Sequence, residues 1–202
     1  MQCVILAAGS GSRLSSLADS KPLLPVLGVP LIERNIRNIH TAGITNFTVV
    51  TGHQVDAVES FLDGLAAKLN IAIRCVYNPE WSSTDNGRSV LAAKPFINSP
   101  FILTMADHLA TPELISRLLQ DKDENAVLSL AIDRRLDNPA VDLADVTRVQ
   151  SEGRHLIAVG KGLTVYDCWD TGFFYCHQPQ EFFQALEHCH SKNKTSLTDA
   201  VK

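Results

Sequence analysis

Residues 3–14 read CVILAAGSGSRL, and this stretch decides the fold. The apolar run from Val4 to Leu6 predicts a short buried strand that ends at a loop of small residues. Such a loop lets backbone N–H groups approach a bound anion, because no large side chain stands in the way. Arg13 and then Lys21 add two positive charges that suit phosphate oxygens. The order of strand, loop, arginine and lysine predicts a site for a triphosphate.

Two better-known phosphate loops do not fit this stretch. A dinucleotide fingerprint would need a third glycine at the position of Leu14. A Walker A loop would need Gly-Lys-Ser or Gly-Lys-Thr after its spacer, and the chain has neither. An ordinary strand-to-loop turn would also contain glycine and serine, but it would not explain the arginine and lysine that follow in order.

The composition of the chain limits its class. With 202 residues, of which 45% are hydrophobic, the chain can form one domain with a substantial core. A formal net charge of −4 disfavours nucleic acid or an anionic membrane as the main partner. No transmembrane run or signal peptide is evident, so we expect no stable membrane insertion. The five cysteines lack metal-binding or disulfide spacing, which predicts a reduced, cytoplasmic protein.

Strand and helix patterns alternate along the first half of the chain. Helical spacing marks residues 31–41 and 55–69, whereas β-branched runs predict strands at 46–51 and 71–77. This order predicts right-handed βαβ units, so we expect an α/β fold with a three-layer, Rossmann-like, mixed but mainly parallel sheet. Ligands of such sheets bind at the carboxyl ends of the strands, which puts the glycine loop, Gly52 and Asn78 on one rim.

A long polar loop follows the third predicted strand. Residues 77–90 read YNPEWSSTDNGRSV, and their amides and hydroxyls could recognise a base or an alcohol through hydrogen bonds. An exposed loop in which Asp85 or Asn86 caps the next helix explains the same residues equally well. The residues alone leave both interpretations open.

The apolar strand at residues 100–106 ends in Asp107. A carboxylate at the end of a central strand faces the ligand rim, where it can hold Mg²⁺ beside phosphates. A helix-capping aspartate is the plainer alternative, but residues 111–113 (Thr-Pro-Glu) already supply that helix start. We therefore expect Asp107 to bind Mg²⁺, with His108 as either a substrate contact or a solvent-facing imidazole.

The last third of the chain predicts a small antiparallel lobe over the rim, spanning roughly residues 133–170 of one domain. Residues 146–149 and 155–159 are short strand-like segments on either side of a Ser-Glu-Gly turn, which is typical of a β-hairpin. Lys161 is a candidate phosphate contact there, although such charges are usually solvated. Asp170, which precedes Gly172 and an aromatic strand, could bind acceptor hydroxyls or simply start the strand.

Taken together, these motifs resemble the sugar-phosphate nucleotidyltransferase superfamily. The likeness rests on AAGSGSR at 7–13, KPLLPV at 21–26 and GVPLIER at 28–34, and it extends over most of the chain. Within the superfamily the chain is most similar to CTP:inositol-1-phosphate cytidylyltransferases. The resemblance implies a nucleotide-diphospho-sugar transferase fold, catalysis by Arg13 and Lys21, and a metal on Asp107. It also implies nucleotide-binding residues and substrate contacts: Ala7, Ala8, Gly9, Ser10, Gly11, Ser12, Gly52, Asn78, Asn86, Gly87 and Ser89 for the nucleotide, and His108, Lys161 and Asp170 for the acceptor.

The implied reaction joins a nucleoside triphosphate, CTP in the first instance, to a phosphorylated alcohol such as inositol 1-phosphate. Pyrophosphate is released, and Mg²⁺ assists. Three alternatives stay open: phosphocholine as acceptor, a hexose 1-phosphate with UTP or dTTP, and a catalytically weak regulatory nucleotide-binding domain.

The resemblance has one gap at the carboxyl end. Superfamily members usually continue into one more strand with a second metal-binding aspartate, and the chain reaches Lys202 without it. We expect a truncated chain, a substitute role for Asp170, or weakened activity. The sequence leaves open the oligomeric state and any fusion to, or association with, a downstream enzyme.

Overall fold

A computed structural model describes residues 1–11, 19–120, 123 and 125–201 of the chain. In these residues, eight strands form one sheet in the order β5-β4-β1-β6-β10-β8-β9, with β7 paired to β10. The parallel part consists of β1 (Gln2–Leu6), β4 (Asn46–Thr51), β5 (Ala72–Tyr77) and β6 (Phe101–Met105). The antiparallel part consists of β7 (Leu128–Asp133), β8 (Arg148–Glu152), β9 (His155–Gly160) and β10 (Cys168–Cys176). The mixed sheet confirms the predicted α/β fold.

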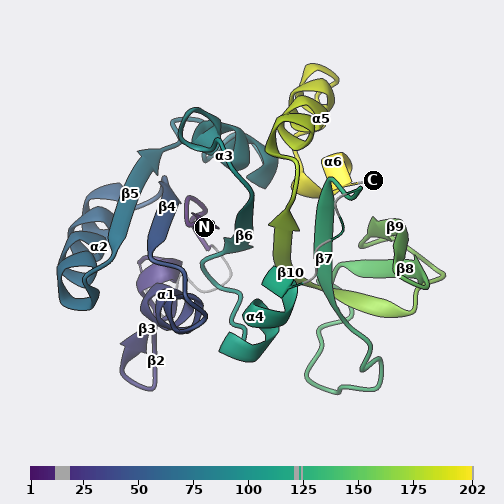
Figure 1. Cartoon of the computed structure of the whole chain (residues 1–202), viewed down its shortest axis with the longest axis horizontal. Helices are drawn as coiled ribbons and strands as arrows, with labels where there is room; N and C mark the ends of the chain where they lie inside the picture. Colours follow the sequence, from purple (N-terminus) through teal and green to yellow (C-terminus); the bar gives the residue numbers. More distant parts are fainter. Residues whose placement is uncertain (12–18, 121–122, 124, 202) are drawn as a thin grey trace.

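Helices cover both faces of the sheet and so produce three layers (Figure 1). One face packs against α1 (Leu31–Thr41), α2 (Val55–Leu69) and α4 (Pro112–Gln120). The other packs against α3 (Asn86–Ala93), α5 (Pro179–Ser191) and α6 (Leu197–Val201). Side chains along β1 alternate between these layers, with Cys3 and Ile5 in one core and Val4 and Leu6 in the other. Burial on both faces explains why this strand is an unbroken apolar run.

A two-stranded sheet of β2 (Pro25–Val26) and β3 (Val29–Pro30) lies between a short 3-10 helix, η2 (Lys21–Leu23), and α1. Leu27 and Gly28 form its turn, with φ of 49° and 78°. Two left-handed residues in succession give the tight turn that suits the twist of a hairpin. Two-residue strands leave no periodic pattern, which is why the sequence did not predict them.

The hairpin predicted at residues 146–159 is present as β8 and β9. The strand β8 pairs with Cys168 and Trp169 of β10, so the hairpin extends the main sheet and is not a separate layer. In Figure 1 it lies at the end of the sheet beyond β7 and β10. A small cluster of Val149, Val159 and Cys168 forms its own core. The boundaries of an inserted lobe at 133–170 stay a prediction.

Two other features bear on the predictions. The helix that follows the polar loop, α3, begins at Asn86, directly after Asp85, which is the last residue with extended backbone, at φ −79° and ψ −179°. Across the described part of the chain, no helix combines the length and the apolar character needed to cross a membrane.

Two helical glycines allow a matched test of packing. A Cβ at Gly64 in α2 would meet no atom of the described residues within 4 Å. Gly64→Ala should therefore raise the free energy of unfolding by about 0.5–1 kcal/mol, since alanine loses less conformational entropy. A Cβ at Gly87 in α3 would lie 2.5 Å from the carbonyl oxygen of Thr195. Gly87→Ala should lower the same free energy by about 1–3 kcal/mol. Urea denaturation measures both, and shifts of the same sign would contradict this packing.

Candidate active site

The loop that follows β1 is held by its backbone on the rim of the sheet. The N–H of Ala7 donates to the carbonyl of Val50 at 2.8 Å, and the N–H of His53 donates to the carbonyl of Ala8 at 2.9 Å. The backbone at Gly9 is open to the described part of the protein, because a Cβ there would meet none of its atoms within 4 Å. Among the described residues the loop therefore faces the open cleft, and anion binding there stays a prediction.

Gly11 makes room for the lysine of the site. Its φ is 62°, a left-handed conformation that glycine adopts without strain. A Cβ at this position would lie 2.5 Å from the Cβ of Lys21. The small residue thus lets the Lys21 stem lie against the loop. Arg13 and Ser12 fall outside the described residues, so their predicted roles stay predictions.

The loop after β6 carries Asp107 and is tied to the rest of the protein at both ends. The N–H of Ala106 donates to the carbonyl of Leu6 at 2.9 Å. From α1, the side-chain amides of Asn35 and Asn38 donate to the carbonyls of Met105 and Ala110, at 3.0 and 2.9 Å. These bonds satisfy backbone groups that would otherwise be left without partners, and they position the carboxylate.

Asp107 is the electrostatic centre of the site. Its Oδ2 pairs with the ammonium of Lys21, and its Oδ1 accepts a hydrogen bond from Nδ1 of His108 at 3.0 Å. Burial acts to raise the pKa of Asp107, but the hydrogen bonds and positive charge of His108 and Lys21 outweigh it. The pKa is held well below its usual value, so the carboxylate is ionised throughout the physiological pH range.

His108 also connects Asp107 to β10. A Cβ at Gly172 would lie 2.4 Å from Cδ2 of His108, so the ring packs directly on the glycine backbone. Gly172 has a φ of 75° and sits where the register of β10 against β7 shifts. Its N–H donates to Oδ1 of Asp170 at 2.6 Å. Burial raises the pKa of Asp170, although this hydrogen bond and the nearby His108 act in the opposite direction.

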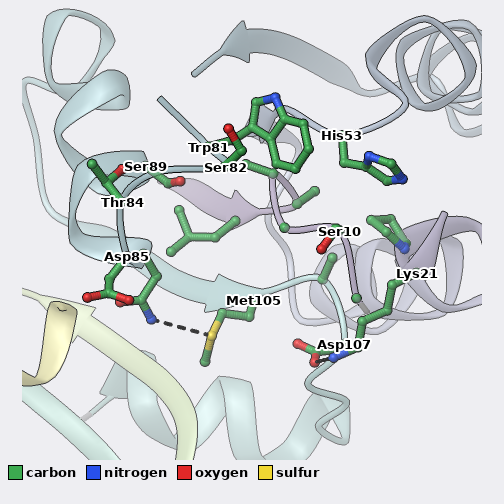
Figure 2. A pocket seen from close by; sticks show the side chains of 18 residues that line it. Ser10, Lys21, His53, Trp81, Ser82, Thr84, Asp85, Ser89, Met105 and Asp107 are labelled. Atoms are coloured by element: carbon green, nitrogen blue, oxygen red, sulfur yellow. Dashed lines mark hydrogen bonds and ion pairs between the residues drawn. The ribbon is translucent and has the colours of Figure 1, made fainter. Parts of the chain in front are cut away.

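A cleft of about 740 Å³ opens above these residues (Figure 2). Predicted residues that line it are Ala7, Ala8, Gly9, Ser10, Gly11, Lys21, Asn86, Ser89 and Asp107. Residues on or next to β1, η2, α3 and β6 thus meet in one place, although 100 positions separate Ala7 from Asp107 in the sequence. Lys21 is the lysine of this lining, and it lies next to Asp107 at one end of the cleft in Figure 2.

Three residues that were predicted to bind the nucleotide lie behind the residues that line the cleft. Asn78 is 1% exposed. Its amide donates to Oγ of Ser89 at 3.0 Å, and its Oδ1 accepts the N–H of Glu80 at 3.0 Å. Gly52 is packed so tightly that a Cβ would lie 2.6 Å from the carbonyl oxygen of Ala8. Gly87 is similarly packed against Thr195. These residues shape the wall of the cleft.

Three predicted acceptor residues also lie outside the lining. His108 and Asp170 are next to it, through Asp107 and Gly172. Lys161 is exposed at the end of the β8–β9 hairpin, where its ammonium pairs with Asp145 at 2.6 Å. Lys161 does not line the cleft, and its role in substrate binding stays a prediction.

Nine described residues of the lining were not among the predicted site residues: Leu6, Pro22, His53, Trp81, Ser82, Thr84, Asp85, Met105 and Ala106. Nε2–H of His53 donates to the carbonyl of Asp19 at 3.0 Å, and its ring packs on Trp81 with centroids 5.2 Å apart. Sequence reasoning could have found His53 and Met105 from their positions. His53 lies just beyond the end of β4 and Met105 is the last residue of β6, so both lie on the predicted rim.

A rim of parallel strands, a loop of small residues, and a lysine beside a carboxylate define a site for nucleotide phosphates. Comparison with known proteins agrees. Residues 3–194 match the family of MobA-like NTP transferase domains, and the chain belongs to this family. Members of the family generally use a divalent metal ion.

Two curated proteins and one solved structure illustrate what this chain is similar to. The "Bifunctional IPC transferase and DIPP synthase" of Rubrobacter xylanophilus is 37% identical over 177 residues, which cover 87% of this chain and 38% of that protein. The protein of the same name from Archaeoglobus fulgidus is 31% identical over 202 residues, with 100% and 38% covered. The inositol-1-phosphate CTP transferase structure from T. maritima has a TM-score of 0.87 at 20% identity, covering 99% of this chain and 79% of that one. The chain thus spans little more than a third of the length of these two curated relatives.

The charge arrangement around Asp107 gives a prediction. Lys21→Met should raise the pKa of Asp107 toward its ordinary value, because it removes one of the positive charges that lower it. The pKa can be followed by a carbon NMR titration of the Asp107 carboxyl group. Lys68→Met is the matched control, since Lys68 pairs with Glu33 on another part of the protein. The arrangement would be contradicted if the pKa of Asp107 did not rise in Lys21→Met, or if it rose equally in Lys68→Met.

The lowered pKa of Asp107 also determines how the stability of the protein changes with pH. A carboxyl group with a lowered folded pKa stabilises the protein above its unfolded value of about 3.9, and this stabilisation is lost as the pH falls toward the folded pKa. Below about pH 4, the wild type should therefore lose more stability on acidification than Lys21→Met does.

Proposed function

We propose that this domain transfers the cytidylyl group of CTP to inositol 1-phosphate and releases pyrophosphate. The observation that carries the proposal is the meeting of Lys21 and Asp107 beside the small-residue loop, in a cleft large enough for a nucleotide. The choice of donor and acceptor is supported by the relatives named as IPC transferases. Association with a second enzyme and a cytoplasmic location are predictions from the sequence.

The proposed reaction needs no general base. A phosphate oxygen of the acceptor, already anionic near neutral pH, attacks the α-phosphorus of CTP. A bond forms between that oxygen and the α-phosphorus, and the bond from the α-phosphorus to the α–β bridging oxygen breaks. Pyrophosphate leaves with the electron pair. The protein therefore has to position the reactants and offset negative charge.

The residues of the cleft divide these tasks. The backbone from Gly9 to Gly11 and the predicted Arg13 hold the outer phosphates. Lys21, whose ammonium is placed beside Asp107, offsets the charge that develops on the α-phosphoryl oxygens. The residues near His108 and Asp170, next to the Asp107 end of the cleft, receive the acceptor.

The residues also fit a magnesium ion that arrives with the nucleotide. Asp107 supplies an ionised carboxylate, the hard oxygen ligand that Mg²⁺ prefers. Within the described ranges, no cluster of three or more His, Cys, Asp or Glu side chains could hold a metal by itself. A site with one carboxylate is normal for Mg²⁺ that is shared with substrate phosphates. The ion would polarise the phosphoryl oxygens and offset their charge.

The structure disfavours phosphocholine as acceptor. A quaternary ammonium needs a cage of exposed aromatic faces. Trp169, Phe173 and Tyr175 are 3%, 1% and 6% exposed, and the indole N–H of Trp169 donates to the carbonyl of Arg135 at 3.2 Å. Trp81 lines the described part of the cleft, whereas these three buried residues do not.

The test is pyrophosphate release with Mg²⁺ across CTP, UTP, ATP and dTTP. Each nucleotide is combined with inositol 1-phosphate, phosphocholine and glucose 1-phosphate. The proposal predicts the highest kcat/KM for CTP with inositol 1-phosphate. Higher kcat/KM with another pair would contradict the choice of substrates. Nucleotide binding without pyrophosphate release from any pair would contradict catalysis and favour a regulatory domain.

Lys21→Ala should lower kcat by about 100-fold or more, because the charge it offsets is largest in the transition state. Lys94→Ala is the control, since Lys94 is exposed, pairs with Glu187 and does not line the cleft. It should keep wild-type kcat. Steady-state kinetics on folded variants measure both, and a Lys21→Ala enzyme with wild-type kcat would contradict the assigned role.

Chelation should abolish turnover, and added Mg²⁺ should restore it. Asp107→Asn should raise the Mg²⁺ concentration needed for half-maximal rate by about tenfold or more, because the amide is a much weaker ligand for a hard cation. A magnesium titration of the rate measures this shift. Equal half-maximal concentrations in the two proteins would show that Asp107 does not hold the ion.

A further inference from the structure

A second cavity, of about 390 Å³, lies outside the active cleft. It forms where α1, the end of α2 and the β2–β3 hairpin come together (Figure 1). Its polar lining in the described structure consists of Glu33, Arg34, Arg37, Asn38 and Lys68. None of the residues that line this cavity also lines the active cleft. The cavity is therefore separate from the site to which the proposed reaction is assigned.

The lining of this cavity carries an excess of positive charge. Arg34, Arg37 and Lys68 are cationic, and the described lining has one acid, Glu33. Three positive charges and one negative charge leave a formal charge of +2. The whole chain has a formal net charge of −4, so this concentration of cations is local. A concave surface lined by charges of one sign raises the local concentration of the opposite ion, and the cavity therefore attracts anions.

Glu33 holds two of the three cations in place, although its single charge can neutralise only one of them. Nε and Nη2 of Arg37 donate to Oε1 of Glu33 at 2.8 and 2.6 Å, and the ammonium of Lys68 lies 3.4 Å from the same oxygen. Burial acts to raise the pKa of Glu33, but the hydrogen bonds and charges of Arg37 and Lys68 hold it below its usual value. The ionised carboxylate thus positions two positive side chains at the cavity.

Arg34 has no carboxylate partner among the described residues. Its Nε donates to the carbonyl of Val26 at 2.9 Å, and its Nη2 donates to the same oxygen. These bonds fix the guanidinium beside the β2–β3 turn and leave its charge uncompensated. Arg34 and Arg37 are three positions apart on α1, so their side chains are neighbours on the helix. In the described structure both use Nε and Nη2 for internal bonds, which leaves the two N–H groups of each Nη1 for a ligand.

The cavity also touches the loop that carries Asp107. Leu109, two positions after Asp107, is part of its lining. The side-chain amide of Asn38, which lines the cavity from α1, donates to the carbonyl of Ala110 at 2.9 Å. The cavity is thus in contact with the loop that supplies the Asp107 carboxylate to the cleft, although the cavity and the cleft share no lining residue.

We propose that this cavity is a second anion site, which binds the phosphate group of a small molecule through Arg34, Arg37 and Lys68. Guanidinium groups match the geometry of phosphate oxygens, and the lysine adds a compact positive charge. Side chains that are already restrained lose less conformational entropy on binding than free side chains do. The site goes beyond the proposed function, because it shares no lining residue with the cleft and requires no nucleotide there.

The test is an NMR titration of the full chain with inorganic phosphate, pyrophosphate and inositol 1-phosphate as separate probes. The Nε–H signals of Arg34 and Arg37 should shift and saturate, with a Kd of about 10 mM or tighter for at least one probe. The amide signals of Gly9 and Gly11 report binding in the cleft separately. The probe with the lowest Kd at the arginines shows whether the site takes a free phosphate, a diphosphate or a phosphate ester. The absence of a saturable shift at both arginines with all three probes overturns the proposal.

A pair of charge-matched variants separates a specific site from the general field of the protein. Arg37→Gln should raise the Kd measured at Arg34 by about tenfold or more, because it removes a charge-assisted hydrogen bond to the phosphate. Arg74→Gln removes the same charge from an exposed arginine that stacks 4.7 Å from the centre of the Phe96 ring and does not line the cavity. It should change this Kd by less than about twofold. Equal changes in the two variants overturn the proposal.

Lys68→Gln serves as the second variant if Arg37→Gln does not fold. The Lys68 side chain is 63% exposed, so its replacement should cost little stability. It should raise the Kd at the arginines by about threefold or more, and it should leave the affinity measured at Gly9 and Gly11 unchanged. An unchanged Kd at the arginines overturns the proposal. Failure of pyrophosphate release together with intact binding at the arginines overturns the proposed function alone.

Discussion

The ion pair between Lys21 and Asp107 is the interaction on which the rest of the site depends. It brings a positive and a negative side chain together at one end of the cleft, and it lies where the loops after β1 and β6 approach each other. Those strands are neighbours in the sheet, with Leu6 opposite Met105. Gly11 packs against the Lys21 side chain and His108 donates a hydrogen bond to Asp107, so both members of the pair are restrained. A cation for phosphate and a carboxylate for a metal are thereby held within one site.

The surrounding structure serves to hold these two loops in place. Two asparagines of α1 donate to the backbone around Asp107, and the carbonyl of Ala8 accepts the N–H of His53 beyond β4. On the opposite wall, residues 195–197 fix α3. Each bond uses a backbone or amide group that would otherwise be left without a partner at the edge of the sheet. The wall and the rim are therefore parts of one hydrogen-bonded framework, and a change far away in sequence can alter the cleft.

Local sequence predicts the parts of this site that depend on strand ends. The apolar runs before Gly9 and Asp107 identify two central strands, and parallel topology then places both loops on one rim. What the sequence could not supply are contacts between distant segments. The Asn78 side chain could hydrogen-bond a ligand, but in the structure it forms hydrogen bonds with Ser89 and Glu80 instead. Lys161 looked like a phosphate contact, but its pairing with Asp145 depends on how the hairpin folds. The contact of residues 195–197 with α3 leaves no periodic signal, because it is made by single hydrogen bonds.

The central claim is that Lys21 and Asp107 act on the same phosphates as one unit. A double-mutant cycle of Lys21→Met and Asp107→Asn, measured as kcat/KM with CTP and inositol 1-phosphate, tests it most directly. If the two residues act together, the double variant should lose about as much kcat/KM as the worse single variant. Losses that multiply, as for independent sites, would contradict the claim that this pair forms one reaction centre.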